Sequence, residues 1–109
     1  MKKTIVLPII VLVASLIGTM VLAENPATKN AGEAKFKELC SMCHPDGGNI
    51  VNPKKTLSKK DRDANNIKNE ADIVKLMRKP GPGMTAFDAR KATDREAGEI
   101  ARYIVKTFK

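Results

Sequence analysis

The chain has 109 residues, 20 of them basic and 12 acidic, and a formal net charge of +8. A chain of this length forms one small domain that buries only about 60–65% of its unfolded surface, which excludes a multidomain architecture. One tyrosine, three phenylalanines and no tryptophan leave little aromatic bulk for an interior. Something other than side chains is therefore expected to help fill the core.

The N-terminal segment has the layout of an export signal. Lys2 and Lys3 give it a positive start, and residues 5–17 are almost wholly apolar. A small residue, Ala23, ends the pattern at the position where a signal peptidase cuts. The pattern predicts a signal peptide over residues 1–23 and export to the periplasm or an equivalent compartment.

The alternative to cleavage is a membrane anchor that is retained, because residues 5–22 reach the lower limit for a membrane span. The polar break and the cleavage pattern favour removal, which leaves one domain, residues 24–109, with no stable insertion in a membrane. Nucleic acid is a poor partner for an exported protein. The excess of basic residues therefore favours acidic protein surfaces as partners.

The first helix of the mature chain is expected to begin at Asn30, after an irregular lead-in over residues 24–29. Asn30 can cap this helix, and Glu33 follows at the spacing of a capping box. Four residues then share one helical face: Phe36, Leu39, Cys40 and Cys43. The segment Pro45–Gly48 is expected to end the helix, because proline and paired glycines cannot continue it.

An irregular loop is predicted over residues 45–57, and two short helices after it. Ser58 can cap a helix that runs to about Ala64, and Asn69 can cap another that stops before Pro80. Three residues share the apolar face of the second of these helices: Ile73, Leu76 and Met77.

The segment Pro80–Phe87 is expected to be a stiff, irregular loop, since it is rich in proline and glycine. Thr93 and Glu96 repeat the capping-box spacing at the start of a terminal helix. The apolar stripe of this helix consists of Ala97, Ile100, Ala101, Ile104 and Phe108. No alternation of period two has convincing length, so the predicted fold is all-α with a single domain.

Both cysteines and the only histidine lie within one short stretch, Cys40–His44. A structural zinc site needs four ligands, and this stretch supplies three at most. A thioredoxin-like dithiol belongs at the start of a helix in an α/β fold, and a disulfide across a two-residue gap constrains the unfolded chain very little. The sequence C-x-x-C-H is instead the signature of covalent haem c attachment.

This signature assigns a role to each residue of the stretch. Cys40 and Cys43 are expected to bond one haem through its two vinyl groups, because residues three apart are neighbours on a helix. His44 can turn its imidazole to the iron as the proximal ligand. Since no second histidine exists, Met84 in the proline- and glycine-rich loop is favoured as the distal ligand, whereas Met77 fits the apolar face of its helix. An open position or a lysine ligand is the alternative to Met84.

Together these motifs resemble those of class I c-type cytochromes, most closely the short soluble cytochrome c6 group, from about Gly32 to Phe108. The shared features are the C-x-x-C-H motif, the sequences GGNIVNPKKTL and GMTAF, and the helix residues Gly32, Phe36, Ile100 and Tyr103. The resemblance implies the class I cytochrome c fold, with about four helices wrapped around one covalently bound haem. It also implies that the first and last helices cross where Gly32 allows close approach.

The resemblance implies a soluble, exported monohaem carrier that moves single electrons between redox proteins and is not an enzyme. His44 and Met84 would hold a low-spin iron. We expect the second ring nitrogen of His44 to bond a backbone carbonyl within Asn49–Pro53. Two alternatives stay open: a haem-based ligand sensor or peroxide-reacting module, which needs Met84 to be absent or labile, and a dedicated redox subunit docked on an enzyme.

The partners are expected to be redox proteins with acidic docking surfaces, which meet a monomer at its exposed haem edge. Basic residues that could form a positive rim there are Lys54, Lys55, Lys59, Lys60, Arg78 and Lys79. Redox encounters are small and short-lived, so charge steering matters more than buried contacts.

Two positions depart from the pattern of the family. The segment Pro80–Phe87, which carries Met84, is called the methionine loop below. Thr85 stands where a proline is common in this loop of the family, and this change is expected to loosen it. Arg62 stands where an apolar residue is usual, so the short helix around it is expected to be partly exposed.

Overall fold

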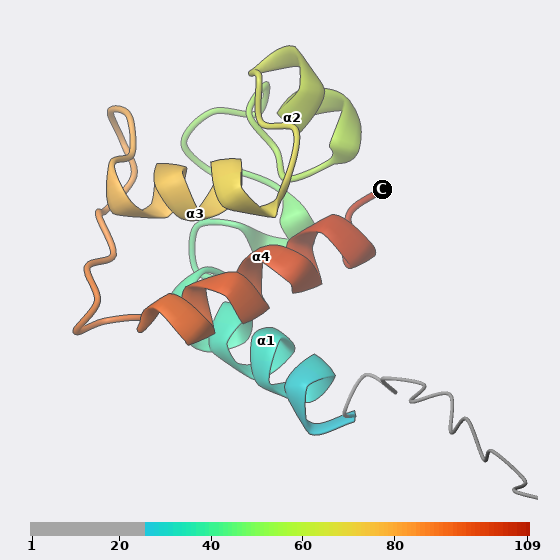
Figure 1. The fold of residues 1–109 in the computed structure, drawn as a ribbon. Helices are drawn as coiled ribbons and strands as arrows, with labels where there is room; N and C mark the ends of the chain where they lie inside the picture. The colour runs from blue at the N-terminus through green and yellow to red at the C-terminus, as the bar shows by residue number, and fades with distance from the viewer. Residues whose placement is uncertain (1–25) are drawn as a thin grey trace, which may run out of the picture.

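The computed structural model describes residues 26–109 (Figure 1). In this range the chain forms four α-helices: α1 (Pro26–Leu39), α2 (Lys59–Ala64), α3 (Glu70–Arg78) and α4 (Asp94–Thr107). A 3-10 turn, η1 (Pro45–Gly47), lies between α1 and α2, and the described residues contain no strand. The predicted all-α fold is confirmed. The predicted signal peptide, residues 1–23, lies outside the described part of the chain.

Helix α1 begins earlier than predicted. It starts at Pro26 rather than after a cap at Asn30, because the fixed φ angle of proline suits the first turn of a helix and its missing N–H costs nothing there. The expected irregular lead-in is therefore wrong for residues 26–29. Among the described residues, none of the helices is both long enough and apolar enough to cross a membrane.

Helix α1 also ends earlier than predicted, at Leu39 rather than just before Pro45. The N–H groups of Cys40 and Ser41 both donate to the Phe36 carbonyl, at 2.8 and 3.1 Å. The Cys40 bond keeps the helical spacing of four residues, whereas the Ser41 bond spans five, so the regular helical pattern ends at this turn. The cysteine motif consequently forms a turn of its own after α1.

The other three helices start at the predicted caps: Ser58 for α2, Asn69 for α3 and Thr93 for α4. The Ser58 hydroxyl accepts the N–H of Asp61 at 3.3 Å. Asn69 and Thr93 each complete a capping box with the residue three positions later. These caps need only residues of one turn, so local sequence is enough to find them.

Helix α4 packs against both α1 and α3 (Figure 1). A Cβ atom on Gly32 of α1 would lie 2.3 Å from the backbone oxygen of Glu99, so only glycine lets the two backbones approach this closely. The predicted crossing at Gly32 is confirmed. Beside it the ring of Phe36 packs against those of Tyr103 and Phe108, with centroids 5.2 and 5.5 Å away.

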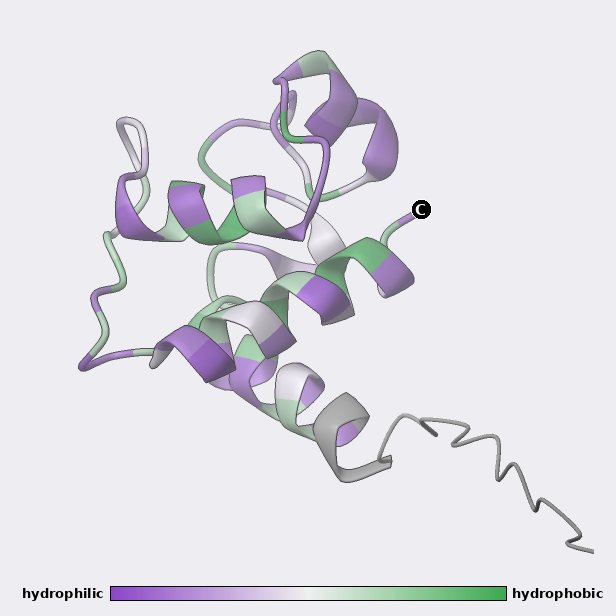
Figure 2. Cartoon of the chain, viewed as in Figure 1, coloured by the Kyte–Doolittle hydropathy of each residue, from purple (hydrophilic) through white to green (hydrophobic). Residues whose placement is uncertain are grey.

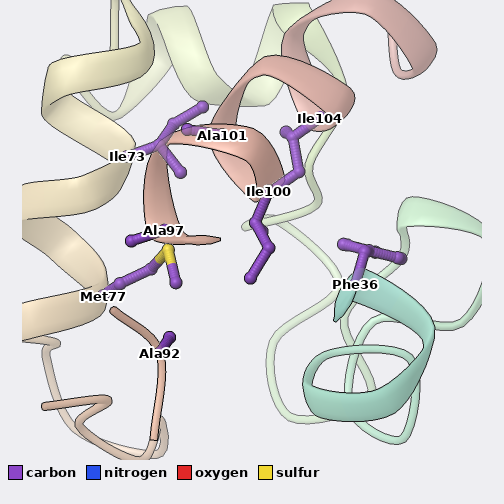
Figure 3. Close-up of a cluster of buried hydrophobic side chains, with 8 residues drawn as sticks. All are labelled: Phe36, Ile73, Met77, Ala92, Ala97, Ile100, Ala101 and Ile104. Atoms are coloured by element: carbon purple, nitrogen blue, oxygen red, sulfur yellow. The ribbon is translucent and has the colours of Figure 1, made fainter. Parts of the chain in front are cut away.

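The buried core is small and centres on α4 (Figure 3). Its members are Phe36, Ile73, Met77, Ala92, Ala97, Ile100, Ala101 and Ile104. Only one of them is aromatic and three are alanines, so side chains supply little bulk, as the composition indicated. Met77 belongs to this core, which confirms its predicted packing role. Figure 2 shows apolar residues along α3 and α4, whereas α2 is mostly hydrophilic.

Candidate functional site

A single turn after α1 carries the two cysteines and the histidine. The N–H groups of Cys43 and His44 both donate to the Cys40 carbonyl, at 3.2 and 2.8 Å. The three predicted attachment residues therefore lie together at the C-terminal end of α1. Cys40 is half-buried and Cys43 is exposed, and both thiols are free.

The environment of these cysteines does not favour a redox-active dithiol. Burial, with a smaller contribution from neighbouring Cys43, raises the pKa of the Cys40 thiol to about 11. Redox-active thiols have lowered pKa values and commonly sit at helix N-termini, whereas this pair follows a helix C-terminus. The raised pKa of Cys40 and the position of the pair after a helix C-terminus therefore both argue against thiol–disulfide exchange.

The ring of His44 is held by a backbone carbonyl. Its Nδ1 lies 2.7 Å from the Gly48 oxygen. Because a carbonyl only accepts, Nδ1 donates and Nε2 keeps its lone pair for a metal. The predicted kind of partner is confirmed, but the predicted range Asn49–Pro53 is wrong by one residue. Turn η1 brings Gly48 back to the ring, with left-handed φ angles of 51° at Asp46 and 78° at Gly47.

The loop that holds His44 is tied to α2 and to the end of α4. A Cβ atom on Gly47 would lie 2.4 Å from the Phe108 ring, so this ring packs directly on the loop. The Leu57 N–H donates to the Gly47 carbonyl at 2.7 Å. Arg62 then donates from Nε to the Leu57 carbonyl at 2.9 Å and from Nη2 to the Phe108 carbonyl at 3.1 Å.

Arg62 is a supporting residue of the site that its sequence position does not suggest. The short helix α2 is partly exposed, as expected, but Arg62 itself is buried, with an exposed fraction of 4%. A guanidinium group can be buried where carbonyl oxygens accept its N–H groups. Its two partners lie 5 and 46 residues away in sequence, and no local pattern indicates the second.

Met84 lies in the loop between α3 and α4. Its side chain is half-buried and packs against the core. The preceding residue, Gly83, has a φ angle of 89°, and a Cβ atom there would lie 3.0 Å from the Val51 side chain. The loop that follows His44 and the loop that carries Met84 therefore lie against each other.

Unburied apolar surface gathers around these loops. The large exposed apolar residues of the described chain are Met42, Ile50 and Val51, all within or just after the cysteine motif. Other apolar side chains pack half-buried at the edge of the core, including Leu57, Ile67, Val74, Met84 and Phe87. An apolar ring that covered this surface would be stabilised by its burial. Free thiols, a histidine with Nε2 available and this surface together fit a covalently bound haem.

Comparison with known proteins agrees with this chemistry. The profile of a family described as "Cytochrome C oxidase, cbb3-type, subunit III" matches residues 27–104. A cytochrome c6 from Cyanidium caldarium is 32% identical over 74 residues, which span 68% of this chain and 66% of that protein. The chain therefore belongs to the family of the matching profile. It is a class I c-type cytochrome close to cytochrome c6.

Solved structures of such cytochromes share the fold. OmcF, an outer-membrane cytochrome from Geobacter sulfurreducens, is 41% identical with a TM-score of 0.69, over 72% of this chain and 99% of that one. Cytochrome c6 from the diatom Phaeodactylum tricornutum is 31% identical with a TM-score of 0.67, over 72% and 91%. The class I cytochrome carries haem c bound covalently and is an electron carrier rather than an enzyme, as predicted.

The basic residues predicted to form a docking rim are not alike in this cytochrome. The Arg78 side chain is 22% exposed and donates to two backbone carbonyls and a carboxylate. It is therefore not the free surface cation that the docking prediction requires. Lys59 pairs with Asp63. Four of the predicted cations are exposed and form no ion pair within the described residues: Lys54, Lys55, Lys60 and Lys79.

Proposed function

We propose that this cytochrome is a soluble one-electron carrier whose iron is held by His44 on one face and Met84 on the other. Cys40 and Cys43 would hold the group covalently, and haem c supplies the one-electron couple. The observation that carries the proposal is the His44 ring, whose Nδ1 bonds the Gly48 carbonyl at 2.7 Å and so leaves Nε2 for iron.

The second ligand is inferred by comparing the methionines. His44 is the only histidine. Met77 is buried in the core and Met42 is exposed, whereas Met84 is half-buried in a loop that contacts the histidine loop. A thioether ligand raises the potential relative to a haem with two histidines. Occupation of both faces would leave no open position for a substrate or a gas, which favours a carrier over a sensor.

The deciding measurement is the far-red absorbance band of sulfur-ligated ferric haem, followed through a redox titration. Met84→Ala should lose this band and lower the potential. The matched control, Met77→Ala, should keep the band but lose about 2–5 kcal/mol of stability through the cavity it leaves. An exchange of these two behaviours would refute the assignment of Met84. Ready binding of carbon monoxide or cyanide by the wild type would favour the sensor or peroxide-reacting alternative.

We expect the chain to be exported after removal of residues 1–23, which leaves residues 24–109 as the mature domain. The charged start, the apolar stretch and the small residue at the cleavage position support this expectation. Covalent haem attachment, which takes place outside the cytoplasm, supports it independently. Mass spectrometry of protein from the exported fraction should find Glu24 at the N-terminus, and retention of Met1 would indicate an anchor instead.

The partners are proposed to be redox proteins with acidic docking surfaces, which meet a monomer. Basic residues still outnumber acidic ones after Lys2 and Lys3 leave with residues 1–23, and four lysines of the predicted rim are exposed and form no ion pair within the described residues, which supports this proposal. Charge steering accelerates such encounters at low ionic strength, so the association rate should fall as salt is added.

A second candidate function is that of a redox subunit docked on an enzyme. It is favoured by one observation, the description of the matching family as an oxidase subunit. Gentle extraction followed by size-exclusion chromatography separates the two candidates. Elution in a stable complex with an enzyme supports the subunit, and elution as a monomer supports the free carrier.

A further inference from the structure

The methionine loop has few bonds of its own. Between α3 and α4 the chain runs from Lys79 to Thr93 without a helix or a strand. Within the described residues, no hydrogen bond joins the segment Pro80–Ala86 to any other part of the molecule. Met84 lies inside this segment, so, apart from the packing of its side chain against the core, its position depends on how the ends of the segment are anchored.

Each end of the segment has one backbone anchor. On the N-terminal side, the Lys79 N–H donates to the Lys75 carbonyl at 2.9 Å. On the C-terminal side, the Phe87 N–H donates to the Met77 carbonyl, also at 2.9 Å. The position of Phe87 therefore sets where the chain returns after Met84.

The side chain of Arg78 adds a second anchor at this C-terminal end. Its Nη1 donates to the Phe87 carbonyl at 2.7 Å and to the Ala92 carbonyl at 2.8 Å. Its Nη2 donates to the Asp94 carboxylate at 2.7 Å. One guanidinium group thus joins the end of α3, the far end of the methionine loop and the first residue of α4.

The two carbonyl bonds matter more than the ion pair. The Asp94 side chain is 93% exposed, and an ion pair with so exposed a partner contributes little. The carbonyl bonds are part-buried and charge-assisted, which makes them stronger than neutral ones. A planar guanidinium presents its N–H groups in a fixed fork, so a lysine ammonium cannot reproduce the same set of bonds.

We propose that Arg78 is a positioning residue for Met84, because it fixes Phe87 and Ala92 and so holds the methionine loop closed. This inference rests on the proposed function, since it takes Met84 as the distal ligand. Loss of the guanidinium group raises the fraction of molecules in which the loop is open. An external ligand that needs the open form then binds with a correspondingly higher apparent affinity.

The test is a titration of the ferric, haem-loaded protein with imidazole, followed by loss of the far-red band. Arg78→Gln removes the guanidinium group, and Arg78→Lys keeps the charge without the fork. Arg102→Gln is the matched control. It also removes one cation, but Arg102 is half exposed and, within the described residues, its ion pair is a long one of 3.8 Å with Glu70.

Arg78→Gln should bind imidazole roughly 10- to 100-fold more tightly than the wild type, the factor that corresponds to the free energy of about one charge-assisted hydrogen bond. Arg78→Lys should show a smaller gain in affinity, and Arg102→Gln should stay within about twofold of the wild type. If Arg78→Gln yields no haem-loaded protein, the comparison of Arg78→Lys with Arg102→Gln decides.

A urea titration separates positioning from general stability. In the Arg78 variants the far-red band should disappear at a lower urea concentration than the helical circular dichroism signal, with a wider gap than in the wild type. Equal shifts of both signals, or imidazole affinities equal to that of Arg102→Gln, would overturn the inference and leave Met84 ligation intact. A wild type without the band would overturn both.

Discussion

Replacement of Gly32 by alanine tests the close crossing of α1 and α4. The new Cβ atom would lie 2.3 Å from the Glu99 carbonyl oxygen and 3.3 Å from Cβ of Tyr103. Ordinary contacts begin near 3.4 Å, so the two helices would have to separate by about 1 Å, against the close packing of a protein interior. The nearest atom belongs to the backbone of α4, so no side chain can turn aside to make room.

The expected loss of stability combines two opposing effects. Overpacking typically costs about 1–3 kcal/mol, and a clash with backbone belongs near the upper end of that range. Alanine is about 1 kcal/mol more favourable than glycine inside a helix, which offsets part of this cost. A net loss of about 2 kcal/mol would lower the melting midpoint by roughly 8–16 °C in a domain of this size.

The assay is thermal unfolding of the haem-loaded protein, followed by far-UV circular dichroism. Gly98→Ala is the matched control, because Gly98 lies within α4 and a Cβ atom there meets nothing within 4 Å. This control should gain up to about 1 kcal/mol from helix propensity alone. A Gly32→Ala protein that melts at or above the wild-type midpoint would show that the helices do not need this close approach.

Three further predictions concern charged residues. The free energy of unfolding measured in urea should fall by about 1–3 kcal/mol in Arg62→Met, because two part-buried carbonyls lose a charged donor. A variant more stable than the wild type would mean that the desolvation cost of the guanidinium outweighs its hydrogen bonds. The double variant Lys54→Glu, Lys79→Glu should associate more slowly with an acidic redox partner than the wild type does in stopped-flow measurements. The difference between the two rates should narrow as salt is added, because salt at 0.1 M screens charges beyond about 10 Å. Rates indifferent to both reversals would end the docking proposal. The pKa of Glu96 is held below its usual value because its carboxylate accepts the Thr93 N–H, so its stabilisation is present at neutral pH and lost as the pH falls through that lowered pKa. The difference in melting midpoint between wild type and Glu96→Gln should therefore shrink as the pH falls from neutral through and below the ordinary glutamate range, and a constant difference would contradict the capping role.

The sequence by itself determined the features that depend on neighbouring residues. The caps at Ser58, Asn69 and Thr93 could be predicted because a cap bonds within one helical turn. The C-x-x-C-H motif could be recognised because its chemistry needs five consecutive positions. The core position of Met77 followed from the period of the apolar residues around it. The family that these motifs indicated is the one that the comparisons show.

Only the tertiary structure decided which polar groups are buried and what they bind. Arg62 and Arg78 have the local sequence of ordinary helix cations, yet each donates to carbonyls of segments that come near only when the chain folds. The carbonyl that holds His44 and the end of α1 at Leu39 likewise depend on a turn and on packing that local propensity does not encode. Burial makes such bonds necessary, because a polar group removed from water must find a partner, and in a folded chain that partner is often remote in sequence.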